Sequence, residues 1–306
     1  MHEVRISSTG HDRITDIAGL AVGNAEDRRA RTGTTVVLPQ RPATVAVDTR
    51  GGAPGSRETD ALDPSALVAC CHGLVLTGGS VFGLAAADGV TQWLSSRGRG
   101  LPIGGFHVPV VPAAVLFDLL NGGDKNWGEA PPYRALGIAA AEAAATDFAT
   151  GRAGAGLGAV AGDRAGGLGT AAAEAASGFR VGALVAVNSF GPPRDQDMAR
   201  IPLPKAPLLA SNTTIAVVAT DLALDKAACR RIAIMAHDGL ARALRPIHTP
   251  FDGDTVFALA TGAVTPPAPA PLTLTIAGTM AADLLERAVC QALEAAARQH
   301  PDGGLP

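Results

Sequence analysis

The segment that decides the fold is Ser211-Asn212-Thr213-Thr214-Ile215-Ala216-Val217-Val218-Ala219-Thr220. It begins with small polar residues and continues directly into β-branched and apolar residues, which is the composition of a buried strand. The preceding Ile201-Pro202-Leu203-Pro204-Lys205-Ala206-Pro207 contains three prolines, which exclude a helix and favour an exposed connection. Thr213 is therefore expected where a surface segment enters a core strand.

Two interpretations of Thr213 follow from this position. In the first interpretation the Thr213 hydroxyl is a nucleophile that attacks the carbonyl of the residue before it and so cuts the chain. The new α-amine then serves as the base for the same hydroxyl. An α-amine titrates near pH ~8, so much of it can accept a proton at neutral pH. In the alternative interpretation, which this stretch alone favours, Asn212 and Thr213 are ordinary turn residues that open a strand.

The composition of the 306-residue chain predicts an α/β fold with a large core of small side chains. Hydrophobic residues make up 47% of the chain and charged residues 17%, whereas aromatic residues contribute only 4% and glycine supplies 37 residues. Ala-rich helices lying closely on sheets would satisfy this composition. The net charge of −3 gives no electrostatic reason to expect nucleic acid or an anionic membrane as a partner.

The sequence predicts neither a membrane segment nor a cofactor or metal. The N-terminus lacks an apolar run of signal-peptide length, and no window approaches about 18 charge-free apolar residues. The four cysteines, Cys70, Cys71, Cys229 and Cys290, form no C-x-x-C pair and are predicted to be buried free thiols in a reducing cytoplasm. The seven histidines are scattered, which makes a zinc site unexpected.

The apolar patterns give a coarse order of elements. Residues 13–22, 31–39 and 43–48 read as strands that together suggest a meander. Further strands are expected at 73–77, 113–119, 180–188 and 214–220, with another ending at 260. Helices are expected at 81–95, 134–150, 225–243 and 280–299, the third with Asp225 as its N-cap and His237 on its solvent side.

Three short motifs have competing interpretations. Residues 151–158 resemble a phosphate loop in glycine content, but the glycine order is wrong and no Gly-Lys-Ser/Thr follows, so a backbone passing close beneath another layer is expected. The glycine-rich residues 49–55 are expected to form a tight turn rather than to line a pocket. Ser80 is expected to cap a helix, because Gly78-x-Ser80-x-x-Gly83 is not the G-x-S-x-G pattern of a nucleophilic serine.

Polar residues at the ends of two strands are candidates for a site. Asp252-Gly253-Asp254 brings two carboxylates together at the head of an apolar strand. A calcium loop is excluded because the third acidic position and the terminal Glu are missing, while a plain hairpin turn remains the alternative. Asn188 ends the strand at 180–188, where a side chain can face a site.

The order of these motifs resembles a known family. The motifs are Val47-Asp48-Thr49-Arg50-Gly51-Gly52-Ala53, Leu76-Thr77-Gly78-Gly79-Ser80 with Phe82-Gly83-Leu84, Gly151–Gly156, Val187-Asn188 with Gly191, Asn212-Thr213-Thr214-Ile215, and Asp252–Ala258. From about residue 14 to about 295 the chain resembles the L-aminopeptidase/D-esterases, β-aminopeptidases and 6-aminohexanoate-oligomer endo-hydrolases, most of all the last branch. The resemblance implies a four-layer αββα sandwich that forms a single domain over residues 1–306. It also implies that the chain is cut into a large part, 1–212, and a small part, 213–306.

The resemblance also implies roles for individual residues. Cleavage would fall between Asn212 and Thr213, with Thr213 as the nucleophile. Asp252 and Asp254 match the carboxylates that orient and polarise the nucleophile, and Asn188 matches the asparagine that supports the oxyanion. A fixed donor to such an oxygen is worth about 3 kcal/mol in kcat.

Two positions depart from the family pattern. The family's catalytic lysine falls on Asp163, with Arg164 beside it, and a tyrosine of the related hydrolases falls on Phe117. Arg164 could supply a charge but not a tunable base. From the resemblance as a whole we expect an amidohydrolase that acts on small amides, peptides or amino-acid oligomers. We also expect a homo-oligomer, with a tetramer as the leading expectation. The alternative is a non-catalytic member that serves as a binding or assembly scaffold.

Overall fold

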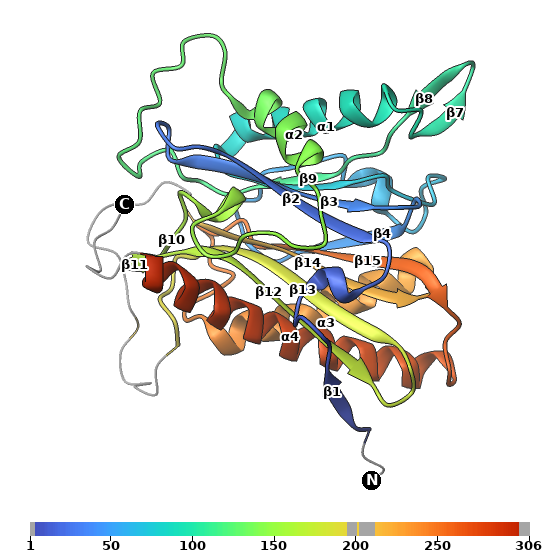
Figure 1. Ribbon diagram of the computed structural model, residues 1–306. Helices are drawn as coiled ribbons and strands as arrows, with labels where there is room; N and C mark the ends of the chain where they lie inside the picture. Colours follow the sequence, from blue (N-terminus) through green and yellow to red (C-terminus); the bar gives the residue numbers. More distant parts are fainter. Residues whose placement is uncertain (1–3, 195–200, 202–211, 300–306) are drawn as a thin grey trace.

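Two β-sheets are stacked face to face, and a pair of helices covers the outer side of each sheet (Figure 1). The structure is a computed structural model that describes residues 4–194, 201 and 212–299. The four layers follow one another in the order helix, sheet, sheet, helix, which confirms the predicted αββα sandwich.

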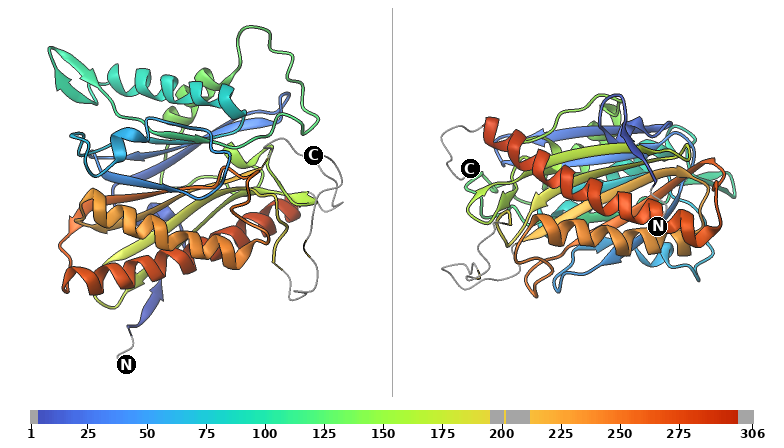
Figure 2. Two further views of the ribbon diagram at one scale, coloured as in Figure 1. Left: turned by 180° about the vertical axis from the view of Figure 1, so that it is seen from behind. Right: turned by 90° about the horizontal axis from the view of Figure 1, so that it is seen from below.

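The larger sheet has six strands in the order β1-β12-β13-β14-β15-β4. β14 and β15 are parallel, and the other neighbours are antiparallel. The strands are β1 (Ile6–Ser8), β12 (Gly167–Ala175), β13 (Arg180–Asn188), β14 (Thr213–Leu222), β15 (Thr255–Val264) and β4 (Thr44–Thr49). Helices α3 (Lys226–Ala243) and α4 (Ala270–Gln299) lie side by side across its outer face (Figure 2).

The second sheet has five strands in the order β2-β3-β6-β9-β5 and is covered by α1 and α2. Its elements are β2 (Leu20–Asp27), β3 (Thr32–Pro39), β6 (Leu74–Thr77), β9 (Ala113–Val115), β5 (Ser56–Arg57), α1 (Ala85–Ser95) and α2 (Tyr133–Glu142). Two small hairpins are β7–β8 (Leu101–Ile103, Phe106–Val108) and β10–β11 (Val160–Ala161, Arg164–Ala165). Short 3-10 turns are η1 (Ile14–Asp16), η2 (Asp60–Leu62), η3 (Ser80–Leu84) and η4 (Gly154–Gly156).

The central strand β14 shows why its sequence is apolar throughout. Val217 packs into the layer between the two sheets, and its neighbour Val218 packs under α3 and α4. A strand covered on both faces loses the alternation of apolar and polar residues. Close packing also explains the many small residues, because a Cβ atom at Gly137 of α2 would lie 2.1 Å from the Ala86 carbonyl oxygen of α1. The predicted close approach of layers is confirmed.

Several predictions of elements were wrong. The meander does not form, because β3 pairs with β2 and β6 while β4 lies in the other sheet beside β15. Strand β12 was missed because its glycines hide its strand propensity; a Cβ at Gly169 would lie 2.0 Å from the Ala288 carbonyl oxygen of α4. Helix α2 ends at Glu142, since the following chain turns back to pair Ala145 with Val22.

The environment of some single residues also differs from the prediction. Only Cys71 and Cys229 are buried; Cys70 is half-buried and Cys290 exposed, and all four are free thiols. The Asp225 cap is confirmed, because its side chain accepts the N–H of Ala228 at 2.7 Å. No helix within the described residues is long and apolar enough to cross a membrane.

Candidate active site

The predicted site residues meet at one edge of the six-stranded sheet. Thr213 is the first residue of β14, and it lies opposite Asn188, the last residue of the antiparallel β13. β15 runs parallel to β14, so the residues that precede β15 reach the same edge, where Asp252 also bridges to Asn212. Strand direction therefore brings together residues as far apart in the sequence as Asn188 and Asp254.

The Thr213 hydroxyl faces the carbonyl of its own preceding residue. The side chain is only 5% exposed, and its Oγ1 donates a hydrogen bond to the Asn212 carbonyl oxygen. The backbone N–H of Gly253 donates to Thr213 Oγ1 at 3.1 Å and to the Asn212 oxygen at 3.2 Å. One N–H group thus contacts both the hydroxyl and the carbonyl.

Asp254 is fully buried and holds the start of β14. Its Oδ1 accepts the N–H of Thr214 at 2.7 Å, next to the hydroxyl-bearing residue. Its Oδ2 accepts the backbone N–H of His248 at 2.9 Å and lies 2.8 Å from His248 Nδ1. With two backbone N–H groups and an imidazole nitrogen around it, this carboxylate is fixed in orientation.

Asp252 is also fully buried, and it holds the loop that leads to β15. Its Oδ2 accepts the N–H of Thr249 at 2.9 Å and the Thr249 hydroxyl at 2.6 Å, while its Oδ1 accepts the N–H of Phe190 at 3.3 Å. Burial, and then the charge of Asp254, raise the pKa of Asp252. Among the described residues, neither carboxylate contacts the Thr213 hydroxyl directly; Gly253 does.

The Asn188 side chain joins β13 to two loops. Its Oδ1 accepts the N–H of Val160 at 2.9 Å, and its Nδ2 donates to the Phe117 carbonyl oxygen at 3.1 Å. These two contacts fix the orientation of a buried amide beside β14.

A pocket of about 350 Å³ opens beside Thr213. It is lined by Ala53, Pro54, Gly55, Ser56, Ser80, Val81, Leu84, Val115, Leu116, Phe117 and Thr213. The glycine-rich turn after β4 therefore lines a pocket, contrary to the favoured prediction. Ser80 does too: it has a φ of +51° and makes no side-chain cap, so the capping prediction was wrong.

Two histidines beside the site were not predicted from the sequence. His237 is 3% exposed, not on the solvent side of α3, and its ring lies edge-on to that of His248 with centroids 4.8 Å apart. His237 Nε2 lies 3.0 Å from the Asp48 carbonyl oxygen. The periodicity of α3 could have revealed its burial, since His237 follows buried Ala233 by four residues on one helix face. Nothing in the sequence marks His248 except its nearness to Asp254.

The positions that depart from the family pattern lie in different environments. Phe117 lines the Thr213 pocket. Asp163 and Arg164 lie at the β10–β11 turn, with side chains that are 85% and 72% exposed, and Arg164 Nε lies 3.8 Å from Asp163 Oδ1. Neither residue lines that pocket. Within the described residues, no three His, Cys, Asp or Glu side chains are grouped so as to hold a metal ion.

The fold is that of the N-terminal-nucleophile (Ntn) hydrolases. The structure is similar to that of a Burkholderia sp. β-aminopeptidase, with a TM-score of 0.71, 24% sequence identity, and coverage of 95% of this chain and 90% of that chain. It is equally similar, with a TM-score of 0.71 and 23% identity, to the L-aminopeptidase D-Ala-esterase/amidase of Ochrobactrum anthropi, described as a variant of the Ntn hydrolase fold; the match covers 94% of this chain and 87% of that one.

Sequence comparison then identifies the family. Residues 12–303 match the model of peptidase family S58, and the chain belongs to that family. An uncharacterized aminopeptidase of Mycobacterium tuberculosis is 46% identical, with 96% of each chain covered. A 6-aminohexanoate-oligomer endohydrolase of Kocuria sp. is 30% identical over 84% of this chain and 78% of that one. The chain is thus a member of a family of aminopeptidases and amide hydrolases.

Proposed function

We propose that the protein is a self-processing amide hydrolase whose nucleophile is Thr213, freed by cleavage of the Asn212–Thr213 bond. The observation that carries this proposal is the contact of the Thr213 hydroxyl with the Asn212 carbonyl oxygen, with the Gly253 N–H directed at both. An attacking hydroxyl, its target carbonyl and a donor to the developing oxyanion are thereby gathered in one place.

Processing follows from this geometry in two steps. Thr213 Oγ1 attacks the Asn212 carbonyl carbon, the C–N bond breaks, and the hydroxyl proton passes to the leaving nitrogen, which leaves an ester. Water then hydrolyses the ester, releasing the Asn212 carboxylate and restoring the hydroxyl of a new N-terminal threonine. The Gly253 N–H stabilises the negative charge that forms on the Asn212 oxygen in the first step.

In the mature enzyme the α-amine of Thr213 would serve as the base for its own hydroxyl. Asn188, opposite Thr213 on the neighbouring strand, would donate to the oxyanion of the substrate. Asp252 and Asp254 would orient the amine through the loop and strand that they hold. An acyl-enzyme forms on Thr213, and water attack releases the product.

The pocket suits a small amide as substrate. Its volume of about 350 Å³ is near the lower end of ordinary ligand pockets. Apolar side chains share its lining with the hydroxyl groups of Ser56, Ser80 and Thr213. Small amides, peptides or amino-acid oligomers fit this description, and the 6-aminohexanoate-oligomer endohydrolase among the relatives supports the last of these.

The test of this proposal is intact mass spectrometry of the purified protein together with assays on a panel of amides and amino-acid oligomers. We expect fragments that begin at Met1 and Thr213. Thr213→Ala should abolish processing and hydrolysis, whereas Thr213→Ser, which keeps a hydroxyl, should retain part of both. Normal cleavage of Thr213→Ala would overturn the assignment. Complete processing without turnover on any amide would favour the binding or assembly scaffold instead.

We also propose that the protein assembles as a homo-oligomer, with a tetramer as the leading expectation. The β7–β8 hairpin projects beyond the end of α1 (Figure 1) and carries the exposed apolar side chains of Ile103, Phe106 and Val108. Apolar side chains grouped on a projecting element favour contact with a second copy.

A further inference from the structure

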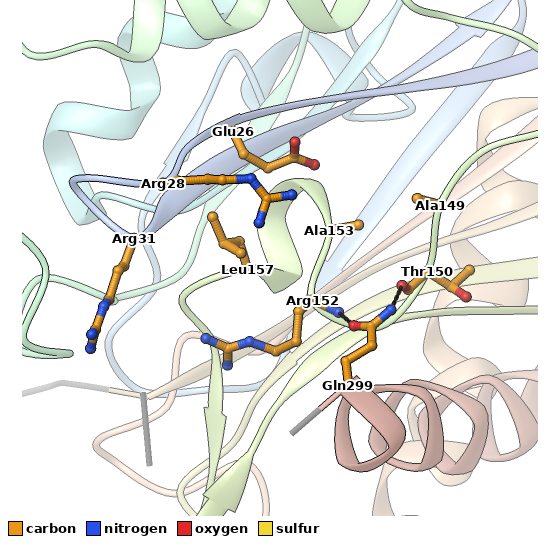
Figure 3. Close-up of a pocket in the computed structure, with 9 residues that line it drawn as sticks. All are labelled: Glu26, Arg28, Arg31, Ala149, Thr150, Arg152, Ala153, Leu157 and Gln299. Atoms are coloured by element: carbon orange, nitrogen blue, oxygen red, sulfur yellow. Dashed lines mark hydrogen bonds between the residues drawn. The ribbon is translucent and has the colours of Figure 1, made fainter. Parts of the chain in front are cut away.

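A second pocket lies apart from the Thr213 site, where β2 turns into β3 (Figure 3). Its volume is about 470 Å³. It is lined by Glu26, Arg28, Arg31, Ala149, Thr150, Arg152, Ala153, Leu157 and Gln299. The lining comes from the β2–β3 turn, from the loop after α2 and from the last residue of α4, and it shares no residue with the Thr213 pocket.

Three arginines give this pocket an excess of positive charge. The guanidinium groups of Arg28 and Arg152 lie beside Leu157, whereas the Arg31 side chain points outward (Figure 3). The Nη1 of Arg31 donates to the Asn121 carbonyl oxygen at 3.2 Å. In the described part of the chain none of the three forms an ion pair, whereas the neighbouring Arg29 pairs with Asp124 at 2.5 Å. Glu26 supplies the one carboxylate among the lining residues, so the three arginines leave an excess of positive charge.

The Glu26 carboxylate is already engaged elsewhere. Its Oε1 accepts the backbone N–H of Gly154 at 2.7 Å. No arginine nitrogen of the described chain lies within ion-pair distance of it, so Glu26 holds the loop in place and forms no ion pair with the three arginines. The positive charge of the pocket remains available to a ligand.

Arg152 has a buried hydrogen-bond donor without an acceptor among the described residues. Its Nη1 donates to the Ala159 carbonyl oxygen at 3.2 Å, but its Nε is buried and has no acceptor among the described residues. Burial, and then the charge of Arg31, lower the pKa of Arg152. A buried donor without an acceptor is costly, and an anion between Arg152 and Arg31 would satisfy the donor and offset the repulsion.

The backbone N–H groups of the loop from Gly151 to Leu157, in contrast, are already engaged. The N–H of Arg152 donates to Gln299 Oε1 at 2.6 Å, that of Gly154 to Glu26, that of Ala155 to Thr35 Oγ1 at 3.0 Å and that of Gly156 to the Ala153 carbonyl at 2.9 Å. A phosphate loop recognises its ligand through such groups. The engaged N–H groups of residues 151–157 argue against a phosphate loop here, and recognition would fall to side chains.

We propose that this pocket binds a small oxyanion, a phosphate or carboxylate group, through the guanidinium groups of Arg28, Arg31 and Arg152. Planar guanidinium groups bind such oxygens with paired, charge-assisted hydrogen bonds. The site is joined to the Thr213 site by a short piece of chain: Arg152 holds Ala159, and the next residue, Val160, holds Asn188 Oδ1. An anion bound at Arg152 braces the loop that orients this asparagine.

Isothermal titration calorimetry of the full chain with inorganic phosphate, and separately with malonate, tests the proposal at low salt. We expect one site per chain with a Kd below about 1 mM for at least one anion, weakened by added sodium chloride. Arg152→Gln and Arg28→Gln should each weaken binding roughly 10-fold, the scale of one lost charge-assisted contact. The anion that binds more tightly identifies the chemical source.

The matched control is Arg41→Gln. Arg41 is exposed and follows the opposite end of β3 from Arg31. The 8 residues of this strand span about 25 Å, so the loss of Arg41 changes the net charge equally without touching the pocket. Binding should change less than about 2-fold. If circular dichroism shows that Arg152→Gln does not fold, the binding measured for Arg28→Gln, at an exposed residue, tests the proposal alone. Absence of saturable binding of both anions, or equal weakening by Arg41→Gln, would overturn the proposal.

Discussion

The Nδ1 atom of His248 lies 2.8 Å from Oδ2 of Asp254, and the backbone N–H of His248 donates to the same oxygen at 2.9 Å. Through its other oxygen Asp254 accepts the N–H of Thr214. His248 thus orients a buried carboxylate that is hydrogen-bonded to Thr214, the residue after the proposed nucleophile. Its backbone is in the left-handed region, with a φ of +58°, which is uncommon outside glycine and asparagine.

This backbone conformation allows a clean pair of substitutions at His248. His248→Gly removes the side chain without backbone strain, and His248→Asn keeps an N–H donor near the position of Nδ1. We expect His248→Gly to lower kcat about 10-fold, because Asp254 loses a charge-assisted hydrogen bond. His248→Asn should retain most of the activity. Steady-state kinetics on the processed enzymes, with melting curves to confirm folding, measure the difference.

The effect of Asp254→Asn on kcat gives the reference with which the His248 variants are compared. Removing the carboxylate should slow the chemistry by at least ~10²-fold, as expected for one positioned proton-handling group. If His248→Gly were as active as the parent enzyme, His248 would have no part in positioning Asp254, and the loop backbone alone would hold the carboxylate.

The stability of the protein should fall on acidification because of His237. Burial lowers the pKa of His237 from its ordinary 6.5 to about 4, and its Nδ1 is buried without an acceptor or donor partner among the described residues. The unfolded chain therefore binds a proton near pH 6.5 that the folded chain does not bind until about pH 4. The contribution of His237 to the free energy of unfolding is therefore fully present above pH 6.5. As the pH falls toward 4, the free energy of unfolding decreases by roughly 3 kcal/mol because of this group.

Urea unfolding of the uncleavable Thr213→Ala protein between pH 7 and pH 4 measures this effect, since the two-chain form would complicate the analysis. His237→Gln keeps a donor for the Asp48 carbonyl oxygen but does not titrate. We expect the variant to lose less stability than its parent over this pH range. Identical pH profiles for the two proteins would show that other groups cause the acid sensitivity.

The residues that meet at the sheet edge were easier to single out in the sequence than the pairing of the strands. Thr213, Asn188, Asp252 and Asp254 are polar residues at the ends of strongly apolar strands, so both the strand pattern and the polar interruption were visible. Strand pairing was not visible, because the partners of β4 are more than 200 residues away in the sequence. The strand β12 was hidden for a physical reason: contact with α4 requires glycine at positions where a strand normally carries larger residues.

Assembly should depend on the β7–β8 hairpin. Phe106 is 74% exposed on this projecting element, and burying it against a second copy would add apolar contact area. We expect Phe106→Asp to shift the protein toward smaller species in light scattering. Leu120→Asp is the matched control, because Leu120 is equally apolar and exposed but lies outside the hairpin. A parent protein that is monomeric at micromolar concentration would contradict the homo-oligomer proposal.

Gly253 offers a test of the proposed oxyanion contact. A Cβ atom at this position would lie 2.7 Å from Thr213 Oγ1 and 2.8 Å from the Ala53 carbonyl oxygen, both too close for van der Waals contact. Gly253→Ala must therefore displace the hydroxyl or the loop, and the N–H that contacts the hydroxyl and the Asn212 carbonyl would move as well. We expect self-cleavage to slow by ~10²-fold or more, the scale for losing one oxyanion donor.

Processing of Gly253→Ala can be followed as the fraction of intact chain in denaturing electrophoresis over time, with circular dichroism as the check on folding. Gly10→Ala is the control, because a Cβ atom there meets nothing within 4 Å and should leave the rate unchanged. Rapid and complete cleavage of a folded Gly253→Ala protein would mean that the Gly253 N–H does not stabilise the oxyanion. The oxyanion donor would then have to be sought in the Asn188 amide, on the opposite side of Thr213.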